Sequence, residues 1–471
     1  MEKHCQREKV IAPLAGVLIL LAAFVLLYQP WRLGERELFR LEGLYAAQTL
    51  EMDYRLPLST AHGIAIQNAF PLYPYLSKLV LGLTGLPVEF AMRLVSVAMT
   101  ALASVLIYLT TMHSRSHVAA QAAAATYFAV NIIFDKTLDA SPVTTVAFGL
   151  LGAQLLWFYF GVGRANWNAA WLTSLTALAL TFYAGGFIVL LFFFFPLIFM
   201  RRPLTLWSKF DKPGLIAGIV IFAGMVLLWA IPYLVFSRIM PFLYWDFGTR
   251  NFAGYLEQLL TFPRDLAFRF LPWTLLAWAP FCVALQPIDE TPIFSRYLRT
   301  IFISGFFLFW LLPGTEAQDL CYLAGPLAIL NGLYYENAVR RYGKVLRFFG
   351  RCGGFAVLAM AIVLIAFCFL PENLMERFVS LTNSIEFRHA TPYLARTLLA
   401  AAALLLIALT LLTGTRRRPV WLVMLLIMVG TGIFFWQSIH VYRIQDRSKS
   451  ELGGELRQAL IDAGAKPDGK L

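Results

Sequence analysis

The chain alternates between long apolar segments and short polar connections from residue 10 to residue 438. A helix of about 20 apolar residues crosses the ~30 Å hydrocarbon core of a bilayer, and the apolar segments are close to this length. They lack the alternation of apolar and polar positions that strands of a membrane barrel require. The pattern predicts an all-α polytopic membrane protein with about thirteen transmembrane helices. Their predicted ranges are 10–29, 88–111, 118–134, 142–162, 167–183, 186–200, 214–236, 271–287, 300–314, 320–336, 353–370, 396–413 and 420–438.

The distribution of basic residues predicts how these helices are oriented. With the N-terminus in the cytoplasm, every predicted cytoplasmic connection carries lysine or arginine, as cytoplasmic loops of membrane proteins commonly do. The clearest examples are residues 201–212, 340–351 and 416–418. The net charge of +12 then follows from this topology and from contact with anionic membrane lipid. Nucleic-acid binding is the weaker explanation, and no nucleic-acid partner is expected.

Composition agrees with a single membrane domain. Hydrophobic residues make up 59% of the chain and charged residues 14%. We expect one transmembrane domain over residues 1–439, which includes a long first extracytoplasmic loop at 30–87, and a short polar extracytoplasmic tail at 440–471. The five cysteines lack the spacing of metal ligands. No phosphate-binding glycine-rich turn is present, so a soluble nucleotide substrate or cofactor is not expected.

The loop at residues 30–87 is too polar to cross a bilayer and contains two predicted short helices. Residues 35–52 have the period of an amphipathic helix, which would lie in the plane of the membrane interface. The turn at residues 70–75 begins a second helix. The side chains of the first helix divide into a predicted apolar side with Leu38, Leu41, Leu44, Tyr45 and Leu50 and a polar remainder with Glu35, Glu42 and Gln48.

The same loop carries a motif. Residues 41–52 partly follow the pattern Asp-Glu-x-x-Tyr-Ala-x-x-Ala-x-x-Met, with matches that include Glu42, Tyr45 and Met52, and residues 69–75 approximate Lys-Pro-Pro-Leu-x-Tyr-Trp. Both patterns are similar to those of the GT-C glycosyltransferases. The branch that the chain resembles includes the lipid A aminoarabinose transferases and the protein O-mannosyltransferases. Further matches follow in the family's order at residues 91–94, 138–139, 246–250, 272–273 and at Tyr322 with Pro326.

The resemblance implies a GT-C fold with interfacial helices in the first loop, in the inner membrane of a bacterium. It also implies an inverting transfer of a sugar from a polyprenyl-phosphate donor to a hydroxyl-bearing lipid, glycan or protein at the extracytoplasmic face. The family's first-loop Asp, which takes the proton from the acceptor, is replaced here by Leu41, and a family lysine is replaced by Gln318. Two alternatives stay open. One is a GT-C-like protein that binds lipid-linked glycans without transferring them, and the other is a transporter or polymerase of lipid-linked polysaccharide.

Sugar transfer to a hydroxyl requires a base, and charged groups near a bilayer are costly unless they have a role. Glu42, next to Leu41, is the first candidate for this base. Asp139 is the second candidate, as a partner of Glu42 or as a ligand of a divalent metal. A helix N-cap is the alternative role for Asp139. Arg93 is expected to anchor the first loop instead of contacting substrate.

The leaving phosphate requires cations or hydrogen-bond donors. Arg250 is the first candidate because a guanidinium can bind phosphate oxygens through two hydrogen bonds, and Arg269 is a further candidate. Each could instead anchor its loop at the lipid headgroups. Three more residues are candidates for the substrate pocket, with packing or a surface position as the alternative, namely Tyr45, His62 and Tyr322.

Overall fold

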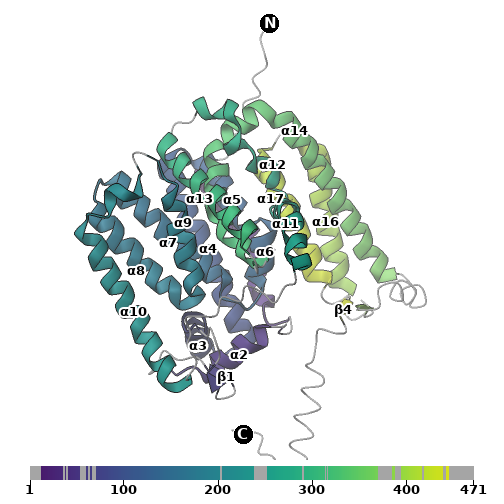
Figure 1. Cartoon of the computed structure of the whole chain (residues 1–471). Coiled ribbons are helices and arrows are strands. Elements are labelled where there is room, and N and C mark those ends of the chain that lie inside the picture. The colour runs from purple at the N-terminus through teal and green to yellow at the C-terminus, as the bar shows by residue number, and fades with distance from the viewer. Residues whose placement is uncertain are drawn as a thin grey trace, which may run out of the picture.

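The computed structural model consists almost entirely of α-helices packed side by side (Figure 1). Within the part of the chain that it describes, seven helices are long and apolar enough to cross a membrane, or eight if one bent pair counts as a span. The predicted all-α polytopic membrane fold is therefore confirmed. The described residues are 12–35, 38, 41–53, 60–61, 64–65, 70–201, 204–237, 252–288, 291–312, 315, 317–369, 385–387, 394–415, 418–438 and 442–444.

Most predicted spans correspond to one observed helix. Some of these, such as the 12-residue α9, are shorter than a bilayer requires on length alone. The helices of the bundle are α1 (Pro13–Tyr28), α4 (Val88–Ser114), α5 (His117–Phe128), α6 (Asn131–Leu138), α7 (Val143–Phe158), α8 (Trp167–Gly185), α9 (Phe187–Ile198), α10 (Pro213–Ser237), α13 (Pro292–Leu311), α14 (Cys321–Phe369), α16 (Leu394–Gly414) and α17 (Val420–Ser438).

The predicted span at 118–134 is wrong as a single straight helix. Its residues form α5 and α6, which are bent by 53° relative to each other. Backbone groups released at such a break need other partners inside a membrane. Here the indole of Trp273 donates to the Ala129 carbonyl at 3.1 Å, and the Asn131 amide donates to the Leu271 carbonyl at 3.3 Å. The break turns α6 away from the direction of α5.

The segment that supplies these contacts was itself predicted as a span, at 271–287, and this prediction is also wrong. It contains only short helical turns, α12 (Thr274–Ala277), η4 (Ala279–Phe281) and η5 (Val283–Ile288). Prolines explain the irregularity, because a proline inside a helix removes a hydrogen bond and clashes with the preceding turn. The three prolines of this segment are Pro272, Pro280 and Pro287.

The predicted spans at 320–336 and 353–370 are joined without a loop. Both belong to α14, a helix of 49 residues, which includes the basic stretch 340–351 that was predicted as a connection. Lysine and arginine are good helix formers, and this stretch contains no proline, so helical structure continues through it. The later part of α14 packs against α16 and α17 (Figure 1).

Close packing of the helices depends on small residues, as is common in membranes, where helices associate through van der Waals contact. The helix α5 contains six alanines in its twelve residues. A Cβ atom added to Gly332 of α14 would lie 2.6 Å from the Ala119 carbonyl oxygen and 2.6 Å from the Ala123 Cβ. The backbones of α5 and α14 therefore approach each other closely at Gly332.

The first loop forms a compact cap at one end of the bundle (Figure 1). It contains α2 (Leu41–Glu51), the short antiparallel strands β1 (Thr60–Ala61) and β2 (Ile64–Ala65), and α3 (Leu72–Thr84). We call this end the first-loop end. Lys78 of α3 donates to the carbonyls of Leu50 and Met52, so α3 caps the last turn of α2.

The two predicted interfacial helices are present, but the buried side of the first one is the opposite of the expected apolar side. Leu41 and Leu50 are more than half exposed, whereas Glu42 and Gln48 are buried. Apolar side chains of an interfacial helix can face lipid, and a buried carboxylate is tolerated where a cation faces it. The exposed leucines of α2 can therefore face lipid, whereas the buried side chains of Glu42 and Gln48 face the protein.

A second short sheet joins two distant parts of the chain. Strand β3 (Ile385–Phe387) pairs antiparallel with β4 (Tyr442–Ile444), and β4 lies toward the first-loop end in Figure 1. Apart from β4, the predicted tail at 440–471 lies outside the described residues. The division into a domain at 1–439 and this tail stays a prediction.

Candidate active site

A cavity of about 830 Å³ opens at the first-loop end of the bundle. Its walls come from α2, the end of α6 with the following turn, α11 (Phe252–Arg269) and residues 315–320. The volume is within the range of pockets for small organic ligands. Among the described residues, seven charged ones line it, five of them acids, namely Glu42, Asp135, Asp139, Glu257 and Asp265, and two of them bases, Lys136 and Arg269.

Glu42 is buried on the side of α2 that packs against α4. It shares this side with Ala46 and Thr49. Ala46 follows Glu42 by four positions and Thr49 follows Ala46 by three, which is the spacing of neighbours on a helix surface. Its carboxylate forms a 3.1 Å ion pair with Arg93 and accepts a 2.7 Å hydrogen bond from the Ala140 amide. Glu42 therefore connects α2 to α4 and to the turn after α6.

Arg93 has the anchoring contacts that the sequence suggested. Its side chain is 1% exposed, and one Nη atom donates to the Leu33 carbonyl at 2.8 Å while the other contacts Glu42. Because both charges of the pair are buried, removing either one would leave the other without compensation in a low-dielectric site. The pair fixes the beginning of the first loop to the start of α4.

Asp139 directly follows α6 and lines the cavity. Its carboxylate lies 2.7 Å from the ammonium of Lys136, which also lies 3.4 Å from the carboxylate of Asp135. The N-cap of the next helix is Pro142, so Asp139 does not have the capping role considered as its alternative. The hydroxyl of Ser96 donates to the Asp139 carbonyl at 3.1 Å, which ties the turn to α4.

The residues around Asp139 do not fit a metal ion. An ammonium group lies against its carboxylate, in the place where a cation would bind. Among the residues that the structure describes, no group of three or more His, Cys, Asp or Glu side chains could hold a metal.

Tyr45 lines the cavity and Tyr322 does not. The Tyr45 ring packs edge-on against Tyr73 at 6.0 Å between centroids, and the Tyr73 hydroxyl donates to the Met92 carbonyl. Tyr322 is 8% exposed and packs between Phe192 and Phe309. Tyr45 belongs to the candidate site, whereas Tyr322 is part of the packing around it.

One face of α11 forms the wall opposite α2 and α6. Its cavity-lining residues recur three and four positions apart, at Gly254, Gln258, Thr261, Asp265 and Arg269. The Gln258 side chain donates to the Leu312 carbonyl at 3.0 Å, and the Trp310 indole donates to the Leu259 carbonyl at 2.7 Å. These bonds hold α11 to α13. Arg269 is thereby placed in the cavity.

Four predicted site residues thus line one cavity, namely Glu42, Tyr45, Asp139 and Arg269. Two others, Arg250 and His62, lie outside the described residues. The motifs of the sequence did not predict that Lys136 also lines the cavity. Its position three residues before the candidate carboxylate of Asp139, at the end of an apolar segment, could have indicated that it lies near the site. Leu41 and Gln318, two of the departures from the GT-C pattern, line the same cavity.

Comparison with known proteins identifies the class of fold. No family model matches the sequence, and no curated protein matches it. Comparison with solved structures shows that the chain has the fold of the GT-C glycosyltransferases, as the sequence predicted. With its long apolar helices, it is an integral membrane protein. Two of the similar structures are of ArnT from Cupriavidus metallidurans, one with undecaprenyl phosphate bound and one in the apo state.

The two ArnT structures match with a TM-score of 0.63 each and with 17% and 16% sequence identity, respectively. In both cases the match covers 90% of this chain and 76% of ArnT. The oligosaccharyltransferase from Archaeoglobus fulgidus, in its apo form, matches with a TM-score of 0.41 and 14% identity, over 86% of this chain and 56% of that one.

Proposed function

We propose that the protein is an inverting glycosyltransferase that moves a sugar from a polyprenyl-phosphate donor to a hydroxyl-bearing lipid, glycan or protein. The observation that carries this proposal is the cavity at the first-loop end, where carboxylates and cations face the same space. The likeness to ArnT, which was solved with undecaprenyl phosphate, supports a polyprenyl phosphate as the carrier. The donor would enter from the bilayer beside the bundle.

Asp139 is the proposed base. Both carboxylates line the cavity, but each oxygen of Glu42 already contacts a buried group, Arg93 or the Ala140 amide. One ion-pair partner of Asp139 is the part-exposed Lys136. Asp139 can contact an acceptor in the cavity without breaking the buried ion pair between Glu42 and Arg93. Glu42 then positions Asp139, because it binds the amide of the next residue.

The chemical step is a single displacement. Asp139 takes the proton of the acceptor hydroxyl, and the hydroxyl oxygen attacks the anomeric carbon of the sugar. The bond from this carbon to the phosphate oxygen breaks, and the polyprenyl phosphate leaves with the electron pair. Attack from the side opposite the leaving group inverts the anomeric configuration. The Asp139 proton is then lost to water.

Lys136 and Arg269 are the proposed partners of the leaving phosphate. They are the cations among the described residues that line the cavity. Negative charge grows on the bridging oxygen as the bond breaks, and a cation placed beforehand lowers the energy of that state. The guanidinium of Arg269 can make two parallel hydrogen bonds to phosphate, whereas Lys136 acts as a compact charge. Arg250 and His62 remain candidates for the same cavity.

Binding of a lipid-linked glycan without transfer is the second candidate function. It is favoured by Leu41 and Gln318, which line the cavity where the family has Asp and Lys. A leucine cannot accept a proton, and a glutamine lacks the positive charge. In the proposed enzyme, Asp139 and Lys136 supply these two functions from the end of α6.

A transfer assay separates the two candidates. The purified full chain is incubated with radiolabelled polyprenyl-phosphate sugars and membrane lipid or glycan acceptors, and both product and free polyprenyl phosphate are measured. The enzyme forms glycosylated acceptor and releases one polyprenyl phosphate for each sugar transferred. A protein that binds the donor lipid tightly yet releases none across the panel would be the binding protein instead. The anomeric configuration of the product tests inversion.

A further inference from the structure

A second cavity lies at the other end of the bundle. It has a volume of about 410 Å³, and it is lined by Phe199, Met200, Arg201, Leu204, Arg296 and Thr300. These residues follow the end of α9 or belong to the first half of α13. The end of α13 leads instead to Thr315, which lines the candidate active site.

The two cavities therefore lie at opposite ends of α13. This helix has 20 residues, and 20 residues of α-helix are about 30 Å long. The hydrocarbon core of a bilayer is also about 30 Å thick. If the candidate active site faces one membrane interface, the second cavity faces the other.

The second cavity has the chemistry of an anion site. Two arginines, Arg201 and Arg296, line it together with Thr300, and none of its described lining residues is acidic. Both arginines are exposed, so they can reorient toward a ligand. Met200 and Leu204 are buried beneath them. Arginine pairs of this kind bind phosphate through charge-assisted hydrogen bonds.

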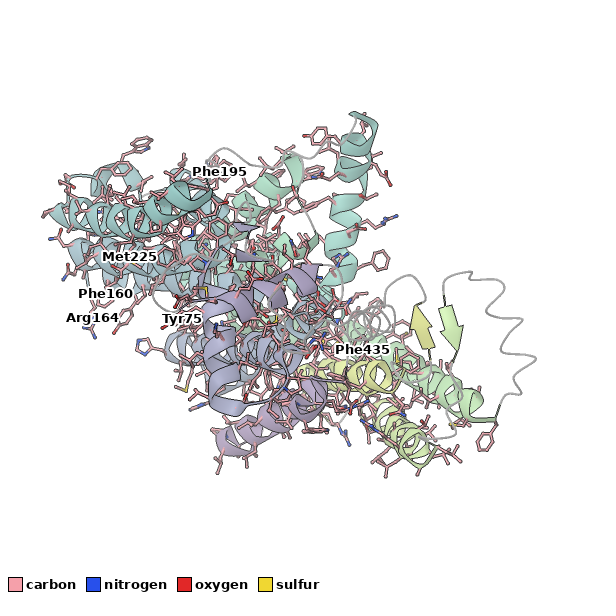
Figure 2. All side chains as sticks on the ribbon, turned by 90° about the horizontal axis from the view of Figure 1, so that it is seen from below. Tyr75, Phe160, Arg164, Phe195, Met225 and Phe435 are labelled. Carbon is pink, nitrogen blue, oxygen red and sulfur yellow. The ribbon has the colours of Figure 1, made fainter. Side chains whose placement is uncertain are left out.

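An apolar strip continues from this cavity along the helices. On α13, Arg296 and Thr300 are followed at helical spacing by Ile303 and Phe307, which are 43% and 45% exposed. On α9, Phe195 packs against Phe199 at 5.1 Å between centroids, and Figure 2 places Phe195 at the periphery of the molecule. A free phosphate ion would leave this apolar surface unused, whereas an acyl chain could cover it.

We propose that this second cavity binds the phosphate headgroup of an anionic phospholipid in the leaflet opposite the candidate active site. Arg201 and Arg296 hold the phosphate, and an acyl chain lies along α13 beside Ile303 and Phe307. Basic pockets between transmembrane helices recognise anionic headgroups in this way. The lipid would hold the end of α9 to α13, and it is distinct from the sugar donor, which belongs to the other interface.

Lipid titration of the purified full chain tests this site. Dioleoyl phosphatidylglycerol, dioleoyl phosphatidylcholine and inorganic phosphate are added separately, and the melting temperature is measured, because a ligand of the folded state raises it. We expect stabilisation by phosphatidylglycerol alone. In the Arg201→Gln/Arg296→Gln variant, the apparent affinity for phosphatidylglycerol should fall at least about tenfold, since charge-assisted bonds are lost.

Arg164→Gln is the matched control. Arg164 is a basic residue at the same end of the bundle, stacked on the Tyr159 and Phe160 rings, and Figure 2 shows it beside Phe160 at the outer edge. This variant should bind phosphatidylglycerol as the native chain does. The Arg201→Lys/Arg296→Lys variant keeps both charges and should retain part of the affinity. Equal binding by native and glutamine variants, or equal stabilisation by inorganic phosphate, would overturn the proposal.

Discussion

At the scale of single residues, the candidate site combines two carboxylates with different roles. Glu42 is 5% exposed and paired with Arg93, whereas Asp139 lies at the cavity edge beside Lys136. From the sequence, Glu42 was the better candidate for a base because it adjoins the position of the family Asp. The geometry favours Asp139, and only tertiary contacts could show this, since Arg93 and Ala140 are far from Glu42 in sequence.

The buried pair predicts a large loss of stability when one partner is removed. Arg93→Met leaves the Glu42 carboxylate buried without its cation, and breaking such a pair costs about 3–5 kcal/mol. We expect a clearly lower melting temperature in detergent, measured by intrinsic fluorescence. The Glu42→Gln/Arg93→Met double variant should recover part of the loss because it removes both charges. No coupling between the two substitutions would contradict the assigned pair.

A second ion pair predicts a pH dependence. Glu35 lies 2.7 Å from Arg32 and 3.3 Å from Arg396 of α16. Burial raises the pKa of Glu35, but the hydrogen bond and charge of Arg32, together with Arg396, outweigh burial and hold it below its usual range. Stability from a lowered pKa is present above the unfolded-state value, about 4.3, and is lost as pH falls through the folded-state value.

Glu35→Gln should therefore lower the melting temperature at neutral pH, by an amount equivalent to no more than about 1 kcal/mol because a third of the side chain is exposed. The difference from the native chain should shrink and vanish as pH falls through the lowered folded-state pKa of Glu35. Melting curves across this range measure it. Glu89→Gln, in the first turn of α4, is the control. A difference that grows on acidification would have the wrong sign.

At the scale of elements, hydropathy predicted the positions of most helices. It did not predict where a helix breaks or where it continues through a polar stretch. It missed the break between α5 and α6, because only the distant Trp273 and Leu271 satisfy the released backbone groups. It also split α14, since charged residues that form helices well look like a loop in a hydropathy profile. Both differences arise from interactions that a local apolar pattern does not contain.

The close approach of α5 and α14 predicts that a methyl group added at Gly332 lowers the stability of the protein. In Gly332→Ala, the new Cβ would meet the Ala119 carbonyl oxygen and the Ala123 Cβ at 2.6 Å, and neither atom can move freely. Overpacking of this kind costs about 1–3 kcal/mol. We expect a lower melting temperature of the purified protein.

Gly152→Ala in α7 is the matched control. A Cβ at Gly152 meets no atom within 4 Å, and alanine is favoured over glycine in a helix by about 1 kcal/mol. This variant should be as stable as the native chain or slightly more stable. Equal effects of the two substitutions on the melting temperature would contradict the close approach of α5 and α14 at Gly332.

At the scale of the whole molecule, two cavities lie at opposite ends of the bundle. The first-loop end has the candidate active site, and the opposite end has the second cavity with Arg201 and Arg296. The alternation of basic loops along the sequence predicts that the end with Arg201 and Arg296 faces the cytoplasm, and this orientation stays a prediction. The contents of the active-site cavity were only partly predictable, since α11 and α6 contribute residues that no single motif links.

Orientation in the membrane can be measured by cysteine labelling. We expect Asp53→Cys, just after α2, to react in intact cells with a reagent that cannot cross the inner membrane. Asp211→Cys, at the opposite end, should react only after the membrane is permeabilised. Both positions are exposed, and a cysteine-free background removes the signal of the native thiols. The reverse labelling pattern would place the candidate active site in the cytoplasm.

Sugar transfer by the Asp139→Asn variant tests the central claim most directly. Asparagine preserves the shape of the side chain but cannot take the acceptor proton, and loss of a general base lowers a rate by about 10²–10⁴-fold. The account predicts this loss with donor-lipid binding unchanged, while Asp211→Asn, at the exposed opposite end, transfers at the native rate. Transfer by Asp139→Asn at the native rate would contradict the proposed site.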